Sequence, residues 1–146
     1  MRKTSSVESK APPDKEWPFL IEPEKILTWC ITFKKFEYTT GQRSGTGTVF
    51  YVEEKAGGSL MKLNFVVTEW EDNRVVAFKM VSETGVKSYE QRWGLEAILP
   101  GSRFDFMEQV ELPLGVLGKL IGKMLQGGSH TTVQKMLAKL KDLAEK

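Results

Sequence analysis

The chain has 146 residues, the length of one domain, and it can bury a core without disulfides or a structural metal. Its 21 basic and 19 acidic residues give a formal charge of +2 and are spread along the chain, which excludes a block of like charge suited to a phosphate backbone. We therefore expect a single domain, residues 1–146, with no nucleic-acid partner.

Cysteine usage and hydropathy indicate the cellular compartment that is expected for the protein. Cys30 is the single cysteine and cannot form an internal disulfide, and the opening residues 1–6 are not followed by the apolar stretch of a signal peptide. The longest strongly apolar stretch, residues 112–125, is too short to cross a bilayer and is interrupted by Lys119 and Lys123. The sequence thus predicts a cytoplasmic protein without a transmembrane segment.

The start of the chain predicts a short strand and then two helical turns. Residues 4–9 alternate weakly and stop at Pro12 and Pro13, because proline cannot continue a hydrogen-bonded ladder. Residues 14–20 and 22–27 have acidic residues near their starts and apolar anchors behind them, which is typical of short helices.

From residue 31 onward the apolar period changes to two, which predicts a series of strands. Short turns rich in glycine or polar residues separate these runs, so neighbouring strands are expected to pair in antiparallel fashion. The predicted strands are residues 31–38, 48–53, 60–70, 75–81, 87–99 and 103–112.

The last third has the composition of a helix in two parts. The first apolar face consists of Leu117, Leu120, Ile121 and Met124. The second consists of Val133, Met136, Leu137 and Leu140, and in a straight helix it would be rotated from the first by roughly 150°. Gly127 and Gly128 lie between the two faces, and Ser129 is a competent N-cap for the second part. We expect a kink or break at residues 126–129.

Several short motifs follow one another along nearly the whole chain. The first group is Ala11-Pro12-Pro13, Trp17, Leu20, Glu22-Pro23-Glu24-Lys25 and Trp29. The second group is Gly45 and Gly47 before a strand, Trp93-Gly94-Leu95, Pro100-Gly101-Ser102, and Leu137-Ala138-Lys139-Leu140-Lys141 with Glu145. This order resembles the START-like (SRPBCC, helix-grip) superfamily, and within it the polyketide cyclase/dehydrase-like family.

The resemblance implies an α+β helix-grip fold. In that fold a bent antiparallel sheet of about six or seven strands wraps around a long C-terminal helix, two short helices follow the first strand, and an elongated apolar cavity remains between sheet and helix. Members of the superfamily bind lipids, sterols, polyketides or plant hormones, and some act as cyclases or co-chaperones. The fold therefore does not decide the function, and none of the motifs carries a catalytic signature.

The usual catalytic and metal-binding residues are scarce. His130 follows Gly127-Gly128-Ser129, where a polar surface residue in the first helical turn is expected, and Cys30 begins an apolar strand, where a buried thiol is expected. One cysteine and one histidine far apart in sequence cannot form a zinc site of the usual ligand count without several carboxylates. Residues 41–47 match neither a dinucleotide fingerprint nor a phosphate loop. We expect no metal and no cofactor.

Strand alternation assigns candidate residues to faces of the predicted sheet. One face of residues 87–99 carries Tyr89, Gln91, Trp93 and Leu95, and one face of residues 103–112 carries Phe104, Phe106, Glu108 and Val110. If these faces are concave, the few polar side chains among them would orient a ligand in an apolar pocket. Alternatively, those side chains lie at the rim in water or pair with one another. Glu108, and after it Tyr89, is the candidate acid, because a carboxyl group in an apolar cavity must be paired or have a raised pKa.

Apolar side chains complete the predicted ligand-binding set. Besides Trp93, Phe104 and Phe106, they are Phe65, Phe78 and Met80 from strands and Leu117, Leu120, Ile121 and Met124 from the helix. Such residues fill a core more often than they contact a ligand, and only cavity volume separates the two roles. Gly115, Gly118 and Gly122 permit either a close approach of helix to sheet or a loose helix that lifts to admit a ligand.

Three functions are compatible with these residues. The first is binding of a small apolar molecule, which would be a lipid, a sterol or a polyketide-like compound, without covalent chemistry. The second is an enzyme of the cyclase or dehydratase kind, in which Glu108 or Tyr89 moves a proton. The third is an interaction protein that docks on a protein partner, a second copy or a membrane surface through residues 114–125.

Overall fold

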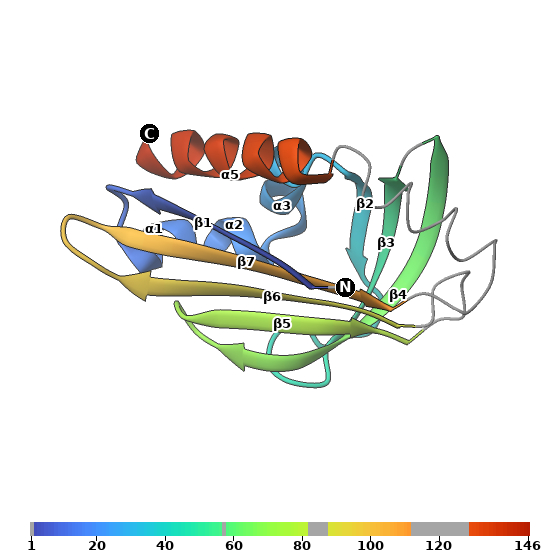
Figure 1. The fold of residues 1–146 in the computed structure, drawn as a ribbon. Coiled ribbons are helices and arrows are strands. Elements are labelled where there is room, and N and C mark those ends of the chain that lie inside the picture. Colours follow the sequence, from blue (N-terminus) through green and yellow to red (C-terminus); the bar gives the residue numbers. More distant parts are fainter. Residues whose placement is uncertain (1, 57, 82–87, 112–128) are drawn as a thin grey trace.

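The computed structural model describes residues 2–56, 58–81, 88–111 and 129–146. Within these ranges a single antiparallel sheet has the strand order β1-β7-β6-β5-β4-β3-β2 (Figure 1). Its strands are β1 (Arg2–Ser9), β2 (Phe33–Tyr38), β3 (Val49–Ala56), β4 (Ser59–Glu71), β5 (Val75–Met80), β6 (Ser88–Ala97) and β7 (Ser102–Glu111). Strands β2 to β7 lie side by side in the order of the chain, and β1 is the edge strand next to β7.

The turns explain why consecutive strands pair. Between β4 and β5, the N–H of Arg74 donates to the carbonyl of Glu71 over 3.0 Å, and Asn73 takes a positive φ of 65°, which asparagine tolerates. Between β6 and β7, the N–H of Ile98 donates to the carbonyl of Gly101 over 2.9 Å. The short turns thus produce the antiparallel series that the sequence predicts.

Three short helices follow β1, namely α1 (Pro13–Glu16), α2 (Pro18–Ile21) and α3 (Pro23–Trp29). Each begins with proline, whose missing N–H has no intrahelical partner to lose at that position. The sequence analysis predicted two helical turns, at residues 14–20 and 22–27. The structure divides the first of them at Pro18, because its nitrogen cannot donate to the helix before it.

Helix α5 (Ser129–Glu145) lies on the concave side of the sheet, next to β1 and α3 (Figure 1). Its inner side buries Met136, Leu137, Leu140 and Ala144. Near its C-terminus, Glu145 accepts a hydrogen bond of 2.7 Å from the backbone N–H of Lys10. None of the described helices is long and apolar enough to cross a membrane.

Several predicted features lie outside the described residues. They are the apolar face made by Leu117, Leu120, Ile121 and Met124, the three glycines at 115, 118 and 122, the docking face at 114–125, and the glycine pair at 127–128. The predicted break at residues 126–129 therefore stays a prediction.

Many aromatic side chains pack in the core between the sheet and the helices. Trp29 of α3 contacts Trp93 of β6 at a ring-centroid distance of 5.0 Å and Phe104 of β7 at 5.6 Å. Phe78 packs edge-on against Trp93, with a ring-centroid distance of 5.1 Å. Such contacts add to the hydrophobic stabilisation of the core. The arrangement as a whole is the α+β helix-grip fold that the sequence predicts.

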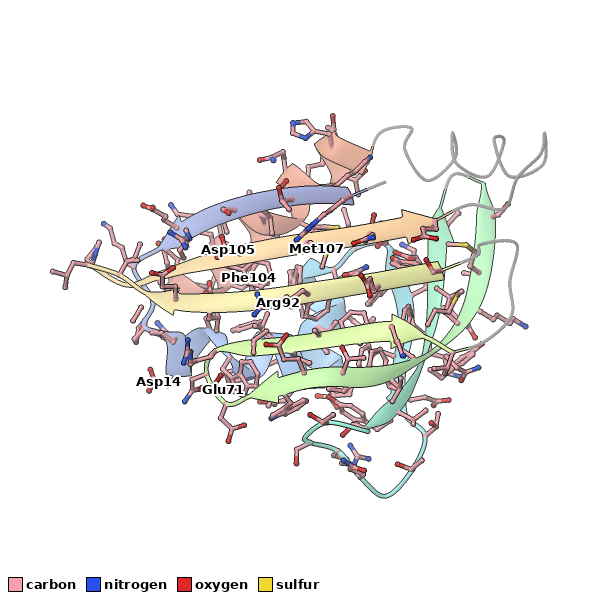
Figure 2. All side chains as sticks on the ribbon, turned by 60° about the horizontal axis from the view of Figure 1, so that its bottom comes forward. Asp14, Glu71, Arg92, Phe104, Asp105 and Met107 are labelled. Atoms are coloured by element: carbon pink, nitrogen blue, oxygen red, sulfur yellow. The ribbon has the colours of Figure 1, made fainter. Side chains whose placement is uncertain are left out.

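Charged side chains, among them Arg92 and Glu71, lie on the face of the sheet turned away from α5 (Figure 2). Arg92 donates to both carboxyl oxygens of Glu69, over 3.1 and 3.2 Å, and Arg74 donates to Glu71 over 3.1 Å. A groove of about 630 Å³ lies among these residues. Its walls place opposite charges side by side, so they largely neutralise each other.

Candidate functional site

Four polar side chains meet on the concave face of the sheet. Tyr89 and Gln91 lie on β6, Glu108 lies opposite Gln91 on β7, and Glu54 lies on β3. Strand β3 is three strands away from β6 in the sheet, but the sheet curves strongly toward α5 (Figure 1). This curvature lets a side chain of β3 reach one of β6 across the concave side.

The hydroxyl of Tyr89 is the centre of this polar cluster. Its oxygen lies 2.8 Å from Oε1 of Glu54 and 3.1 Å from Oε2 of Glu108. The Nε2 amide of Gln91 donates to the Tyr89 oxygen over 2.7 Å and to Oε2 of Glu108 over 3.2 Å. The four side chains therefore form one connected hydrogen-bond network.

Two further residues fix the network at its ends. Nε1 of Trp93 donates to Oε1 of Gln91 over 2.7 Å, and because an indole N–H only donates, this contact turns the amide nitrogen of Gln91 toward Tyr89. The hydroxyl of Thr32 donates to Oε2 of Glu54 over 3.1 Å. A satisfied buried network of this kind holds its side chains in one arrangement.

The carboxyl groups of the cluster are harder to ionise than free glutamate. Burial, and then the charge of Glu108, raise the pKa of Glu54 to about 7, and hydrogen bonds from Tyr89 and Thr32 only partly oppose this. Burial also raises the pKa of Glu108, although Tyr89 and the charge of Lys3 act in the opposite direction. Proton occupancy of the cluster therefore changes close to neutral pH.

A cavity of about 220 Å³ lies beside the cluster, between β1, β7 and α5. Its lining residues are Lys3, Thr4, Ser5, Phe106, Glu108, His130 and Val133. Lys3 and Ser5 lie opposite Glu108 and Phe106 in the pairing of β1 with β7. Glu108 belongs to both the cavity and the cluster, so it connects the cavity to the buried polar network.

Residues 2–145 match the family described as polyketide cyclase / dehydrase and lipid transport. The chain belongs to this family. The match covers nearly the whole chain, as the order of sequence motifs leads one to expect. No curated protein matches the sequence.

Solved structures agree with the family in fold. The chain is similar to the Zhui aromatase/cyclase from Streptomyces sp. R1128, with a TM-score of 0.79 and 16% identity, over 99% of this chain and 93% of that one. It is similar to a START superfamily protein from Mycobacterium smegmatis, with a TM-score of 0.75 and 17% identity, over 97% and 98% of the two chains. It is also similar to a protein from Thermus thermophilus, with a TM-score of 0.79 and 19% identity, over 99% and 97%. At these identities the likeness shows the fold alone.

The structure brings together the polar residues that the sequence analysis singled out. Tyr89 and Gln91 are buried, Glu108 is half-buried, and all three hydrogen-bond with one another. They thus pair with one another, as one of the two sequence-based alternatives supposes. In this polyketide cyclase/dehydrase family member, Glu108 and Phe106 also border the cavity.

The other predicted ligand contacts lie in the aromatic core. Phe65, Phe78, Trp93 and Phe104 are buried, and Met80 packs as a half-buried residue against them. A void bordered by Phe78 and Trp93 has a volume of only about 10 Å³. These side chains fill the core in the structure, and their role as ligand contacts stays a prediction, as does that of Leu117, Leu120, Ile121 and Met124.

Sequence reasoning missed Glu54 and Lys3, although a signal for each was present. Alternation through Phe50 and Val52 places Glu54 on the same face, but the predicted strand ended at residue 53. Alternation on β1 likewise puts Lys3 on the half-buried side, but the predicted strand began at residue 4. In both cases the observed strand includes the missed residue, which lies one position beyond the predicted end of the strand.

The two reactive residue types of the sequence analysis have different surroundings. His130 is exposed in the first turn of α5, as predicted, and it also borders the cavity. Cys30 is buried, and burial together with the charge of Glu54 raises the pKa of its thiol well above the usual value, so an unreactive thiol is expected. Among the residues that the structure describes, no group of three or more potential ligands could hold a metal ion.

Proposed function

We propose that the protein binds a small hydrophobic molecule between the concave face of the sheet and α5. The observation that carries the proposal is the cavity of about 220 Å³, in which apolar Phe106 and Val133 face the same space as Glu108. Lys3, Thr4, Ser5 and His130 complete the lining, and a combination of apolar surface with placed polar groups is typical of sites that bind and orient small molecules. The family description supports a lipid, a sterol or a polyketide-like compound as the ligand.

The network behind Glu108 supports a binding role. A carboxyl group that is partly removed from water costs free energy unless its oxygens have partners. Here Tyr89 and Gln91 both contact Oε2 of Glu108, which holds that oxygen in place. The proposal places the protein in the cytoplasm, in keeping with its single buried cysteine, Cys30.

Native mass spectrometry of the purified protein, followed by extraction of bound small molecules, tests the proposal. We expect a stoichiometric apolar adduct in the wild-type protein. Val133→Phe adds a ring to the cavity wall and should abolish the adduct. Gln134→Phe adds the same ring at an exposed position of α5 and should keep it. Retention of the adduct in both variants would contradict the location proposed here.

A second candidate is an enzyme of the cyclase or dehydratase kind acting on an enclosed apolar substrate. The contact of Tyr89 with both Glu54 and Glu108 favours it, because linked acidic groups can take up and deliver a proton. In this case Glu108→Gln should lower turnover by about 100-fold or more while lowering substrate affinity much less. Equal losses of turnover and affinity would point back to binding without catalysis.

A further inference from the structure

The contacts of Tyr89 need one more proton than its own hydroxyl carries. Its oxygen accepts the N–H of Gln91 and lies within hydrogen-bond distance of both Glu54, at 2.8 Å, and Glu108, at 3.1 Å. A phenol has a single O–H and can donate to only one of the two carboxyl groups. The other contact is a hydrogen bond only if that carboxyl group is protonated and donates to the tyrosine oxygen.

The surroundings of the two carboxyl groups differ in how well they support a negative charge. Glu108 accepts an additional N–H from Gln91, and the charge of Lys3 favours its ionised form. Glu54 is buried, and within the residues that the structure describes its other oxygen is hydrogen-bonded by the neutral hydroxyl of Thr32. The extra proton is therefore better placed on Glu54, and the charge on Glu108.

We infer that Glu54 and Glu108 share one proton through Tyr89, with Glu54 holding it and Glu108 turning an ionised carboxylate toward the cavity. Glu54 is then a positioning residue, because it keeps Glu108 a hydrogen-bond acceptor without touching the ligand. This inference rests on the proposed function and deepens it. The ligand should carry a hydrogen-bond donor, such as a hydroxyl group, on an apolar frame, and Glu108 accepts that donor.

Other charged and titratable groups face this pair. Lys3 of β1 and His130 of α5 border the cavity, and the positive charge of Lys3 favours the ionised form of Glu108. The thiol of Cys30 is within electrostatic reach of both carboxyl groups, but its raised pKa keeps it neutral. Acidification adds a second proton to the pair. Glu108 is then protonated and no longer accepts a hydrogen bond as a charged carboxylate. Binding of a donor ligand should therefore weaken as the pH falls.

The pair can be tested without any ligand, by NMR of protein labelled with ¹³C at the glutamate carboxyl carbon. Glu54→Gln and Glu108→Gln assign the two signals, and each leaves a neutral side chain of the same shape. We expect each signal to report two linked titration steps in the wild type, since strongly coupled groups titrate as a pair. Glu108→Gln should lower the pKa of Glu54, and Tyr89→Phe should change the coupling.

Independent single-step titrations that Tyr89→Phe does not alter would overturn the shared proton, whether or not the cavity binds anything. The exposed Glu90 lies on the same strand and serves as the matched control, so Glu90→Gln should leave both signals unchanged.

The donor requirement is tested with two bicyclic probes of similar shape, 2-naphthol and 2-methoxynaphthalene. A hydrogen bond to a charged group contributes about 1.5–3 kcal/mol, so 2-naphthol should bind about 10- to 100-fold more tightly. Glu54→Gln should keep this preference and leave the pH at which it is lost nearly unchanged, because glutamine replaces a carboxyl group that already holds its proton. Equal affinity for the two probes, or binding of neither, would overturn the donor assignment. Failure of the proposed function would be seen separately, as the absence of any apolar adduct in native mass spectrometry.

Discussion

The hydroxyl of Tyr89 lies 2.8 Å from the carboxyl group of Glu54, although 35 positions separate the two residues in the chain. The contact joins β6 to β3 across the concave face and depends on the curvature of the sheet. The polar cluster at the cavity therefore depends on how these two strands lie relative to each other.

Removal of this hydroxyl should destabilise the protein. Tyr89→Phe leaves the buried amide of Gln91 and the carboxyl group of Glu54 each with one partner fewer, so the free energy of unfolding should fall by about 1–3 kcal/mol. Urea denaturation measures the loss. Tyr51→Phe is the matched control, because the Tyr51 hydroxyl bonds Glu53 over 2.8 Å at a half-buried site. An equally large fall in the free energy of unfolding of Tyr51→Phe would show that the buried cluster contributes no more to stability than a half-buried hydrogen bond.

Glu16 should make stability depend on pH. Its side chain is fully buried, Oε1 lies 3.4 Å from the hydroxyl of Ser9, and Oε2 has no hydrogen-bond partner in the described part of the chain. Burial raises the pKa of Glu16 from 4.5 to about 7, with a smaller contribution from the charge of Glu145. The folded protein therefore holds this proton more tightly than the unfolded chain, and stability is lost as the pH rises from 4.5 to 7.

Glu16→Gln should remove this dependence. The variant should be more stable than the wild type above pH 7, by on the order of 1–3 kcal/mol, and should differ little below pH 4.5. Thermal denaturation at several pH values measures the difference. Glu24→Gln, at an exposed position, should leave the pH profile unchanged. An unaltered profile in Glu16→Gln would mean that the buried carboxyl group is not the source of the dependence.

Gly101 should not tolerate a side chain. A Cβ atom at this position would overlap the carbonyl oxygen of Ser9 and backbone atoms of Lys10, where the end of β1 passes the turn between β6 and β7. Gly101→Ala should therefore destabilise the protein by about 1–3 kcal/mol or more. Gly41→Ala meets nothing within 4 Å and should change stability by about 0.5 kcal/mol at most. Similar melting temperatures for the two variants would contradict this close approach.

The charged groove on the outer face should not hold the apolar ligand. Arg92 and Glu69 form an exposed ion pair there, and pairs of this kind contribute about 0–1 kcal/mol to stability. Arg92→Gln should therefore change the free energy of unfolding by less than about 1 kcal/mol and leave 2-naphthol binding unchanged. Fluorescence titration with 2-naphthol measures the binding. A loss of affinity in this variant would indicate that the outer groove, and not the cavity at Glu108, is the binding site.

Local patterns predict much of this fold. A two-residue period and the turn residues locate six strands to within a few positions, and the prolines locate the short helices. Alternation also assigns Tyr89, Gln91, Phe106 and Glu108 to one side of the sheet, because a side chain's face depends only on its position in the strand. These properties are set by neighbours in the chain, so the sequence is enough to infer them.

The contacts between distant strands are decided only by the tertiary structure. The curvature of the sheet brings Glu54 to Tyr89, and Trp29 of α3 enters the aromatic core, so that Phe78 and Trp93 border almost no free volume while Phe106 and Glu108 border a cavity. Periodicity places all four of these side chains among the predicted ligand contacts and does not separate them. Whether a side chain fills the core or borders a cavity depends on the volume that other elements leave beside it, which is a property of packing in three dimensions.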